Sequence, residues 1–267
     1  MLEIRLYELY DFVTLFLIAE SNVTTSGKAK PYHLKENWSR FARYHSKMRR
    51  VELNQLNHKG MINKTFDPWV FEAKMRDEGL RLALPNSSKD FVLMSADVDE
   101  IPKARFIRAL ASCRLQIPFQ PSLLQCDFHY YSFEYVGIRR YYWPGGSLFR
   151  FSANEKIPSD LRNTRHSYRP IPNACFHCSF CFDTLGSVRT KLSSITHVEL
   201  DIPKYHDQKF IIDRFQNGKD LLDRFSEEVR WINVDEIDLP QLVKLQKSRF
   251  MYILNRSSLP NAGFRDV

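Results

Sequence analysis

The sequence Phe91-Val92-Leu93-Met94-Ser95-Ala96-Asp97-Val98-Asp99-Glu100-Ile101-Pro102 decides the expected fold of this chain. Its first half is an apolar run broken only by one serine, which is typical of a strand buried on both faces. Three carboxylates follow the run, and a proline follows the carboxylates. Because proline suits the first helical turn, we expect a helix from Pro102 to about Cys113. The stretch therefore predicts a buried strand, an acidic turn and a helix.

The preceding sequence has a similar arrangement. Residues 12–19 form another apolar run, and the pair Glu20-Ser21 follows it directly. Between the two runs, the pair Asp67-Pro68 predicts the start of a helix over residues 69–82, because aspartate is a good N-cap and proline suits the first turn. Two buried strands with a helix between them are typical of a parallel sheet covered on both faces. We therefore expect an α/β fold with a mostly parallel central sheet flanked by helices.

The polar residues that follow the two strands are the first candidates for a functional site. In parallel α/β sheets, ligands bind beyond the carboxyl ends of the strands. Glu20-Ser21 and the acidic cluster Asp97-Val98-Asp99 both lie at such ends. We therefore expect a ligand to bind at this edge of the sheet.

The remaining elements are expected from local patterns. Apolar residues at helical spacing predict a helix over residues 2–10, and the alternating, aromatic residues 123–135 predict a long strand. The Trp-Pro-Gly-Gly sequence at residues 143–146 predicts a turn, and residues 154–173 a polar loop. Shorter strands are expected at residues 47–53 and 148–151, and helices at residues 183–194, 208–216 and 220–224. We assign residues 1–205 to one domain, with halves 1–112 and 113–205, and residues 206–267 to a helical extension packed on it.

The composition limits the class of protein. Hydrophobic residues make up 43% and charged residues 26%, which is ordinary for a globular protein with a core and excludes a mainly disordered chain. The net charge of +8 favours anionic partners. The Lys and Arg residues are dispersed and match no nucleic-acid module, so we expect no nucleic-acid partner. No apolar stretch of about 18 residues occurs, and acidic residues interrupt the N-terminus, so neither a transmembrane helix nor a signal peptide is expected.

The carboxylates after the second apolar run suit a divalent cation. Asp97 and Asp99 stand two apart just past a strand, so both can turn towards one ion. Mg²⁺ and Mn²⁺ prefer oxygen ligands, and a bound diphosphate supplies further ones. Such an ion neutralises the charge that develops on a nucleoside diphosphate leaving group. The alternative is an acidic turn that caps the helix at Pro102, since carboxylates favour helix N-termini.

A second chemistry has a similar motif. Phosphatases of the haloacid dehalogenase type also place Asp-x-Asp after an apolar strand, and their first Asp is the nucleophile. Their motif normally starts near the N-terminus, with Thr or Val two positions after the second Asp. Here Glu100 follows Asp99, and the stretch begins only at Phe91. We therefore disfavour this class.

Five cysteines raise the question of metal or disulfide chemistry. They are Cys113, Cys126, Cys175, Cys178 and Cys181, and the odd number leaves at least one thiol free or intermolecular if the rest are paired. The last three, with His177, have zinc-like spacing, but a structural zinc site usually needs a second, distant ligand pair. Core packing or disulfides are therefore favoured. Five glycosylation sequons, at Asn22, Asn37, Asn63, Asn86 and Asn255, favour a secretory compartment.

Several segments together resemble glycosyltransferase family 17, which includes the β-1,4-mannosyl-glycoprotein 4-β-N-acetylglucosaminyltransferase of N-glycan synthesis. The similarity runs from the first residues to about residue 205, and its motifs occur in the expected order. The N-terminal part comprises Leu2-Glu-Ile-Arg-Leu-Tyr-Glu-Leu, Phe16-Leu-Ile-Ala-Glu20-Ser21-Asn22 and Thr25-Ser-Gly27-Lys28-Ala-Lys30-Pro31. The later motifs are Trp69-x-x-Glu72-x-x-x-Arg76-Asp77, Ser95-Ala-Asp97-Val-Asp99-Glu100-Ile-Pro102, His177-Cys178-Ser179-Phe180-Cys181-Phe182, Lys191-Leu192 and Thr196-His197-Val198-Glu199.

The resemblance implies a GT-A-like fold and an inverting transfer of N-acetylglucosamine from UDP-GlcNAc to a mannose-containing glycan of a glycoprotein. It also implies a divalent cation, Mn²⁺ or Mg²⁺, and a Golgi location. Family members usually have a short strand before the Leu2-Glu-Ile segment and an N-terminal membrane helix. Neither is found here, so we expect an N-terminally truncated chain whose only membrane attachment is an anchor outside it. The alternative is an inactive, carbohydrate-binding relative.

The resemblance also gives candidate roles to individual residues. The cation ligands are expected to be Asp97 and Asp99, with His197 as a further one unless it is a core histidine. An inverting transfer needs a base to deprotonate the acceptor hydroxyl, for which the candidates are Asp183, Glu199 and Glu134.

The donor and acceptor need further residues. Glu20, Ser21 and Asp97 are expected beside the nucleotide sugar, and Lys28 and Arg76 on its diphosphate oxygens. The alternative for Arg76 is a surface ion pair with Glu72, one helical turn earlier. Trp143 and the following glycines are candidates for an acceptor platform, and a simple turn is their alternative.

Overall fold

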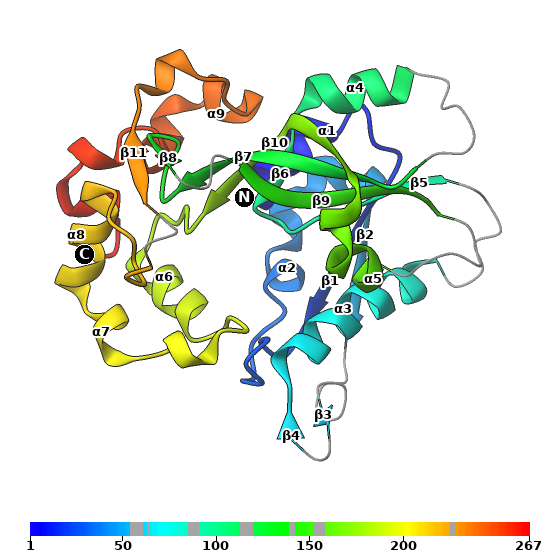
Figure 1. Cartoon of the computed structure of the whole chain (residues 1–267), viewed down its shortest axis with the longest axis horizontal. Coiled ribbons are helices and arrows are strands. Elements are labelled where there is room, and N and C mark those ends of the chain that lie inside the picture. Colours follow the sequence, from blue (N-terminus) through cyan, green and yellow to red (C-terminus); the bar gives the residue numbers. More distant parts are fainter. Residues whose placement is uncertain are drawn as a thin grey trace.

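A computed structural model describes residues 1–53, 61–62, 65–84, 91–112, 120–138, 142–151, 158–224 and 228–267. Within these residues, the largest sheet has seven strands, with helices packed around it (Figure 1). Its strands are β5 (Phe91–Ser95), β6 (Glu100–Pro102), β7 (Ser122–Tyr130), β8 (Tyr135–Gly137), β9 (Tyr142–Phe151), β10 (Arg169–Ser179) and β11 (Val229–Trp231). The other strands are β1 (Phe16–Ser21) with β2 (Met48–Leu53), and β3 (Met61–Ile62) with β4 (Thr65–Phe66).

The α-helices are α1 (Leu2–Leu9), α2 (His33–Glu36), α3 (Pro68–Ala83), α4 (Ala104–Ser112), α5 (Pro158–Asn163), α6 (Leu185–Leu192), α7 (Pro203–His206), α8 (Gln208–Asn217) and α9 (Gln241–Leu245). The 3₁₀ segments are Trp38–Lys47, Arg165–Ser167, Val198–Leu200, Val234–Glu236, Lys247–Ile253, Arg256–Ser258 and Pro260–Gly263. From α6 onward, the chain gathers on the left of Figure 1, together with β8, whereas β5 and β9 lie with α1, α3, α4 and α5 on the right.

The central sheet is mostly antiparallel, and the expectation of a mostly parallel sheet is therefore wrong. Only β7 and β10 pair in parallel. Strand β9 pairs antiparallel with both β5 and β7. The short strands are also antiparallel to their partners: β6 to β10, β8 to β7 and β11 to β8. The apolar strand β5 lies at the edge of the described sheet, with β9 as its partner. The earlier strand β1 pairs in parallel with β2, in a separate two-stranded sheet. The expected burial of β5 on both faces is also wrong, because none of its residues is fully buried and Val92 is exposed. The partner, direction and burial of a strand depend on distant segments.

Several local expectations are confirmed. The helix α1, the strand β2 and the helices α6 and α8 lie within one or two residues of the expected bounds. The Asp67 side chain accepts hydrogen bonds from the N–H groups of Trp69, at 2.8 Å, and Val70, at 3.2 Å, so it caps α3 as expected. The helix after Pro102 also forms, although it begins at Ala104 because the proline belongs to β6.

Other local expectations are wrong. The sequence at residues 143–146 lies inside β9 and forms no turn, and the expected loop at residues 154–173 contains α5 and the start of β10. The long strand expected to residue 135 ends at Tyr130, because Tyr131 has a φ of 69° and turns the chain. Residues 220–224 form no helix. At residues 143–146 long-range sheet pairing overrides the local pattern, and after Tyr130 a backbone turn does so.

Two disulfides join four of the cysteines. Cys126–Cys175 links the parallel strands β7 and β10, and Cys178–Cys181 closes a short loop at the end of β10. Disulfide sulfur atoms are not the thiolates that bind zinc, so the zinc interpretation of this segment is not supported. Cys113 lies outside the described residues.

The described residues contain no helix that is long and apolar enough to span a membrane. The C-terminal segments take part in the same cores as the sheet: Ile211 and Phe215 of α8 pack with Phe128 and Tyr130 of β7. On the other side of the sheet, Leu242 of α9 shares a core with residues of α1 and β6.

Candidate functional site

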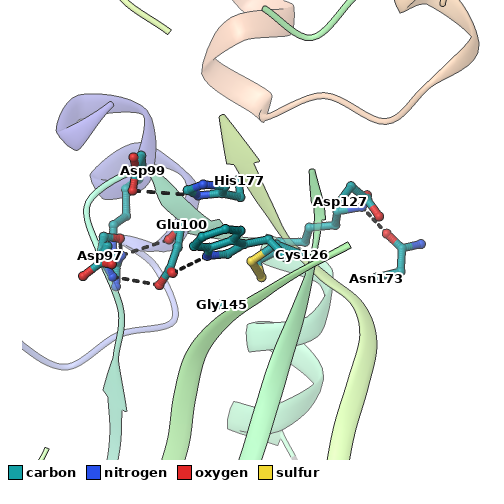
Figure 2. The surroundings of a disulfide bond; sticks show 12 residues. Asp97, Asp99, Glu100, Cys126, Asp127, Gly145, Asn173 and His177 are labelled. Atoms are coloured by element: carbon teal, nitrogen blue, oxygen red, sulfur yellow. Dashed lines mark hydrogen bonds and ion pairs between the residues drawn. A yellow bond between two sulfur atoms is a disulfide. The ribbon is translucent and has the colours of Figure 1, made fainter. Parts of the chain in front are cut away.

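The acidic turn between β5 and β6 is the centre of the candidate site (Figure 2). Its backbone closes on itself, because the Glu100 N–H donates to the Asp97 carbonyl at 3.1 Å. The Asp97 N–H in turn donates to the Glu100 carboxylate at 2.9 Å. Glu100 then enters β6, where it pairs with His177 of β10. The pairing of β6 with β10 therefore brings residues from two distant segments to the same place.

Four arginines, here called the arginine cluster, surround this turn: Arg5, Arg76, Arg162 and Arg165. Arg76 of α3 and Arg162 of α5 donate to the two oxygens of Asp97, at 2.7 and 2.6 Å. Arg162 also donates to Glu100 at 2.9 Å, and Arg5 of α1 donates to the carbonyls of Asp97 and Glu100. The first aspartate of the motif is thus held between two guanidinium groups.

The arginine cluster shifts the titration of its neighbours. Burial favours the neutral form of Asp97, but Arg76 and Arg162 outweigh it and lower the pKa of Asp97 to about 2. Burial and the charge of Arg162 lower the pKa of Arg165 to about 10, and the Arg165 Nε is buried without a hydrogen-bond partner. This orphaned cation, at the edge of a group of ion pairs, suits an anionic ligand.

The second aspartate has different surroundings. Its oxygens lie 3.8 Å from His177 Nδ1 and 3.5 Å from Lys191 Nζ, which are longer than the ion pairs of Asp97. His177 stacks on Trp143, with ring centroids 4.5 Å apart, and Trp143 donates its indole N–H to Glu100 at 2.8 Å. Burial lowers the pKa of His177, although Asp99 and Glu100 oppose the shift, so the ring stays neutral at neutral pH.

The comparison with protein families decides the class. Residues 1–259 match the model of glycosyltransferase family 17. The chain belongs to glycosyltransferase family 17. No curated protein and no solved structure matches it. The match confirms the resemblance found in the sequence. The matched region includes the acidic turn, the arginine cluster and β10.

A divalent cation, as expected for a member of this family, can be tested against the residues present. Within the described part of the chain, no three His, Cys, Asp or Glu side chains gather closely enough to hold a metal ion by themselves. Asp97 is occupied by Arg76 and Arg162. Asp99, by contrast, has only long contacts and faces the unpartnered Nδ1 of His177. The donor set of Asp99 and His177 therefore fits a cation whose other ligands come from a bound diphosphate.

The structure brings three of the expected site residues together, namely Asp97, Asp99 and Arg76. Among the described residues, His197 contacts none of these three. Its ring bonds Glu199 at 2.8 Å and meets the exposed Trp69 edge-on, with centroids 5.2 Å apart. About half of the His197 side chain is exposed, so it is not the core histidine that the sequence allowed as an alternative.

The residues expected beside the nucleotide have partners within the protein. Glu20 is buried and accepts the N–H groups of Leu34 and Lys35, so it caps α2. Ser21 bonds the backbone of Val23 and is fully buried. Lys28 is exposed and pairs with Asp201 at 2.9 Å. Lys28 is the only one of the three whose polar group reaches the surface, so a ligand would meet it first.

The three candidate bases lie in different surroundings. Glu134 is buried and accepts hydrogen bonds from Ser132, Trp231 and both the N–H and the hydroxyl of Ser257. Glu199 is exposed beside His197. Asp183 is partly exposed and pairs with Arg265 at 3.1 Å. Glu134 is therefore committed to the fold, whereas Asp183 and Glu199 can reach a ligand.

The sequence interpretation missed Arg5, Arg162 and Arg165, and it gave His177 only a structural role. Arg162 and Arg165 lie in a stretch that was expected to be a loop, and they gave no local signal. Arg5 had one, because it interrupts the apolar residues Ile4 and Leu6 of α1, both of which are buried. A charged residue among buried helical positions indicates a partner elsewhere in the chain.

Proposed function

We propose that the chain is an inverting glycosyltransferase that moves N-acetylglucosamine from UDP-GlcNAc to a mannose-containing glycan of a glycoprotein, with a GT-A-like arrangement of its donor site. The observation that supports the proposal best is the acidic turn at the end of β5, enclosed by the arginine cluster in a chain that matches glycosyltransferase family 17. A nucleoside diphosphate is an anion, and a cluster of guanidinium groups beside carboxylates is suited to bind it.

In this proposal, the residues of the chain bind and orient the donor. Arg165 and Lys191 contact diphosphate oxygens, while Asp97 and Glu100 hold Arg76 and Arg162 in fixed positions. A divalent cation, Mn²⁺ or Mg²⁺, would supply charge neutralisation on the departing UDP, and Asp99 would hold it. Fixed dipoles and charges of this kind stabilise the leaving group without reorganising during the reaction.

The acceptor needs a base on the face opposite the departing UDP. Among the three candidates, Asp183 supports this role best. It keeps part of its side chain exposed, and it follows the segment 178–182, whose first N–H donates to the Asp99 carbonyl at 3.2 Å. We assign the base to Asp183 in this proposal and leave Glu199 as its competitor.

The compartment follows from the same proposal. Two disulfides are stable in the oxidising secretory pathway rather than in the reducing cytosol. A Golgi lumen location for the enzyme agrees with them and with a glycoprotein acceptor.

The test is UDP release from UDP-GlcNAc in the presence of Mn²⁺, with and without N-glycan acceptors. We expect acceptor-stimulated release that Asp99→Ala lowers by roughly 100-fold or more, because charge stabilisation at a leaving group is worth at least that factor. Asp235→Ala is the matched control: this carboxylate is exposed and pairs with Lys247 at the surface, so its removal should leave the rate unchanged. Folded protein that neither binds nor turns over UDP-GlcNAc would contradict the proposal.

A further inference from the structure

His177 has a buried ring nitrogen without a hydrogen-bond partner. Only 6% of the residue is exposed, and its Nδ1 has no donor or acceptor within reach. A buried polar atom that lacks a partner destabilises the fold, so such atoms are uncommon in proteins. The environment of this nitrogen therefore calls for a partner that the protein itself does not supply.

Aromatic neighbours hold the plane of the His177 ring. Trp143 stacks on it at a 13° interplanar angle, and Phe128 also stacks on it, with centroids 5.7 Å apart. Trp143 is itself fixed by its hydrogen bond to Glu100. The backbone of His177 pairs with Glu100 on one side and Phe128 on the other. The stacking contacts thus fix the plane of the ring, and in this plane Nδ1 faces Asp99 (Figure 2).

The carboxylate of Asp99, which faces this nitrogen, also lacks a close partner. Its Oδ1 lies 3.8 Å from His177 Nδ1, which is too long for a hydrogen bond, and its Oδ2 reaches Lys191 only at 3.5 Å. Only 19% of its side chain is exposed, so water solvates the charge poorly. Asp97 and Glu100, in the same turn, are by contrast bonded to arginines at 2.6 to 2.9 Å. Asp99 and His177 are therefore under-satisfied groups of the site that face each other.

We propose that Asp99 and the Nδ1 of His177 are the protein's two ligands for a divalent transition-metal cation. Asp97 is not a ligand, because the arginine cluster occupies its carboxylate. Two ligands of one small ion lie roughly 3 to 3.5 Å apart, so the observed 3.8 Å needs only a small closure. The inference rests on the proposed function in one respect: only a nucleoside diphosphate donor would add further ligands to the cation. The pairing of Asp99 with His177 is a property of the folded chain and can be tested without nucleotide.

The identity of the ligands sets the preferred ion. One imidazole nitrogen beside one carboxylate favours Mn²⁺ and the later first-row metals over Mg²⁺, which prefers oxygen ligands alone. Lys191 competes with the cation for Asp99, because its ammonium group lies 3.5 Å from the Asp99 carboxylate. The same ammonium group lies over the ring of Phe180. A cation bound by Asp99 and His177 would be repelled by Lys191.

The test is a titration of the full chain with Mn²⁺, in which the electron paramagnetic resonance signal of the free ion reports binding, without nucleotide and then with UDP. His177→Phe keeps a ring for stacking and removes the nitrogen. We expect this variant to stay folded and to weaken Mn²⁺ binding by roughly 100-fold, since loss of an outer-shell partner alone costs about 10- to 100-fold. In the titration without UDP, Lys191→Met should strengthen Mn²⁺ binding several-fold, because a repelling charge is removed.

Three controls make the result specific. His197→Ala removes an exposed histidine and should leave Mn²⁺ binding unchanged. Pulsed measurements on bound Mn²⁺ should show coupling to an imidazole ¹⁴N in the wild-type chain and in the His197→Ala variant, and none in His177→Phe. In the wild-type chain, Mg²⁺ should bind at least about tenfold more weakly than Mn²⁺, and His177→Phe should narrow this difference.

The outcomes separate the inference from the proposed function. Unchanged Mn²⁺ binding in folded His177→Phe, or no ¹⁴N coupling in the wild-type chain, overturns the ligand pair even if UDP-GlcNAc is turned over. The same holds if the wild-type chain binds no Mn²⁺ with or without UDP. Nitrogen-coordinated Mn²⁺ in a chain that never hydrolyses or transfers from UDP-GlcNAc supports the pair and contradicts the proposed function.

Discussion

At the scale of single residues, the buried polar groups divide into those with partners and those without. Glu100 and Asp97 have guanidinium partners, and Arg256 has three backbone carbonyls. His129 and His177 each keep a buried Nδ1 without a hydrogen-bond partner. For His177, we explain the missing partner by the cation that we propose binds between it and Asp99. Among the described residues His129 forms no ion pair with a carboxylate, although the charge of Asp127 acts on it, so we expect its effect on stability.

We predict that His129 makes the fold sensitive to mild acid. Burial lowers its pKa from 6.5 to about 4, so the unfolded chain takes up a proton below pH 6.5 that the native state refuses until about pH 4. The free energy of unfolding is therefore unaffected by the protonation of His129 above pH 6.5, and it decreases as the pH falls from 6.5 towards 4. Between pH 7 and pH 5 the wild-type chain should lose about 2 kcal/mol more unfolding free energy than His129→Leu.

Urea denaturation of both proteins at the two pH values measures this difference. The other titrating groups are the same in both chains, and their effects cancel in the comparison. Equal losses of stability in the two proteins would show that the protonation of His129 is not linked to folding.

At the scale of elements, strand β9 connects the sheet to the site. It crosses the Cys126–Cys175 disulfide at Gly145, and it carries Trp143 to the ring of His177. The helix α3 is similarly fixed, because Asp77 accepts both the N–H and the hydroxyl of Ser159, at the start of α5. These contacts hold Arg76 and Arg162, on α3 and α5, at the two sides of Asp97.

We predict that Gly145→Ala disrupts this crossing. A Cβ at residue 145 would collide with Cys126 Sγ, and it would lie 3.0 Å from the Leu124 carbonyl and 3.1 Å from Cys175 Sγ. Because strand backbone and a disulfide cannot move aside cheaply, we expect a loss of about 1 to 3 kcal/mol in unfolding free energy or incomplete formation of the disulfide. Denaturation curves and a count of free thiols measure the two effects.

The matched control is Gly186→Ala in α6. Its Cβ would meet only the Asp266 carboxylate, at 3.4 Å, and alanine favours a helix over glycine, so this change should leave the chain as stable or stabilise it. Equal effects of the two substitutions would mean that the space above the disulfide does not constrain β9.

At the scale of the whole molecule, the site is made from segments that are far apart in the sequence. Arg5 of α1 and Lys191 of α6 both reach the turn at Asp97 and Asp99. The C-terminal part of the chain supports this assembly through Arg256, which is fully buried. Its guanidinium donates to the carbonyls of Tyr131, Phe182 and Ala262, and so ties the ends of β7 and β10 to the C-terminal segment.

We predict that Arg256→Met destabilises the whole chain. The substitution keeps much of the apolar contact with Phe215 and Phe264 but leaves three buried carbonyls without their donor. Each unsatisfied group costs about 1 to 3 kcal/mol, so the total loss should be at least about 3 kcal/mol. Thermal or urea unfolding measures it.

Arg249→Ala is the control, because Arg249 is exposed and pairs with Glu3 at the surface. Surface pairs contribute at most about 1 kcal/mol, so this variant should remain close to the wild-type chain. If Arg256→Met were equally harmless, the C-terminal segment would not depend on the buried guanidinium.

The sequence alone determined the features that depend on neighbouring residues. It placed Asp97 and Asp99 at the end of an apolar strand, Asp67 at the start of α3 and Arg76 on the same helix, and its ordered motifs identified the family. Such features follow from local propensity, capping and spacing, which a short stretch carries by itself. The sequence could not give the direction of the sheet, because β5 pairs with β9 about fifty residues later.

Only the tertiary structure decided which side chains meet at the site. It placed Arg162 and Arg76 on Asp97, paired His197 with Glu199 and brought His177 to face Asp99. Interactions between charged and polar groups depend on distances of a few ångströms and on burial, and folding sets both. The same carboxylates that the sequence marked as equal members of one motif therefore have different surroundings: Asp97 binds arginines, and Asp99 faces His177.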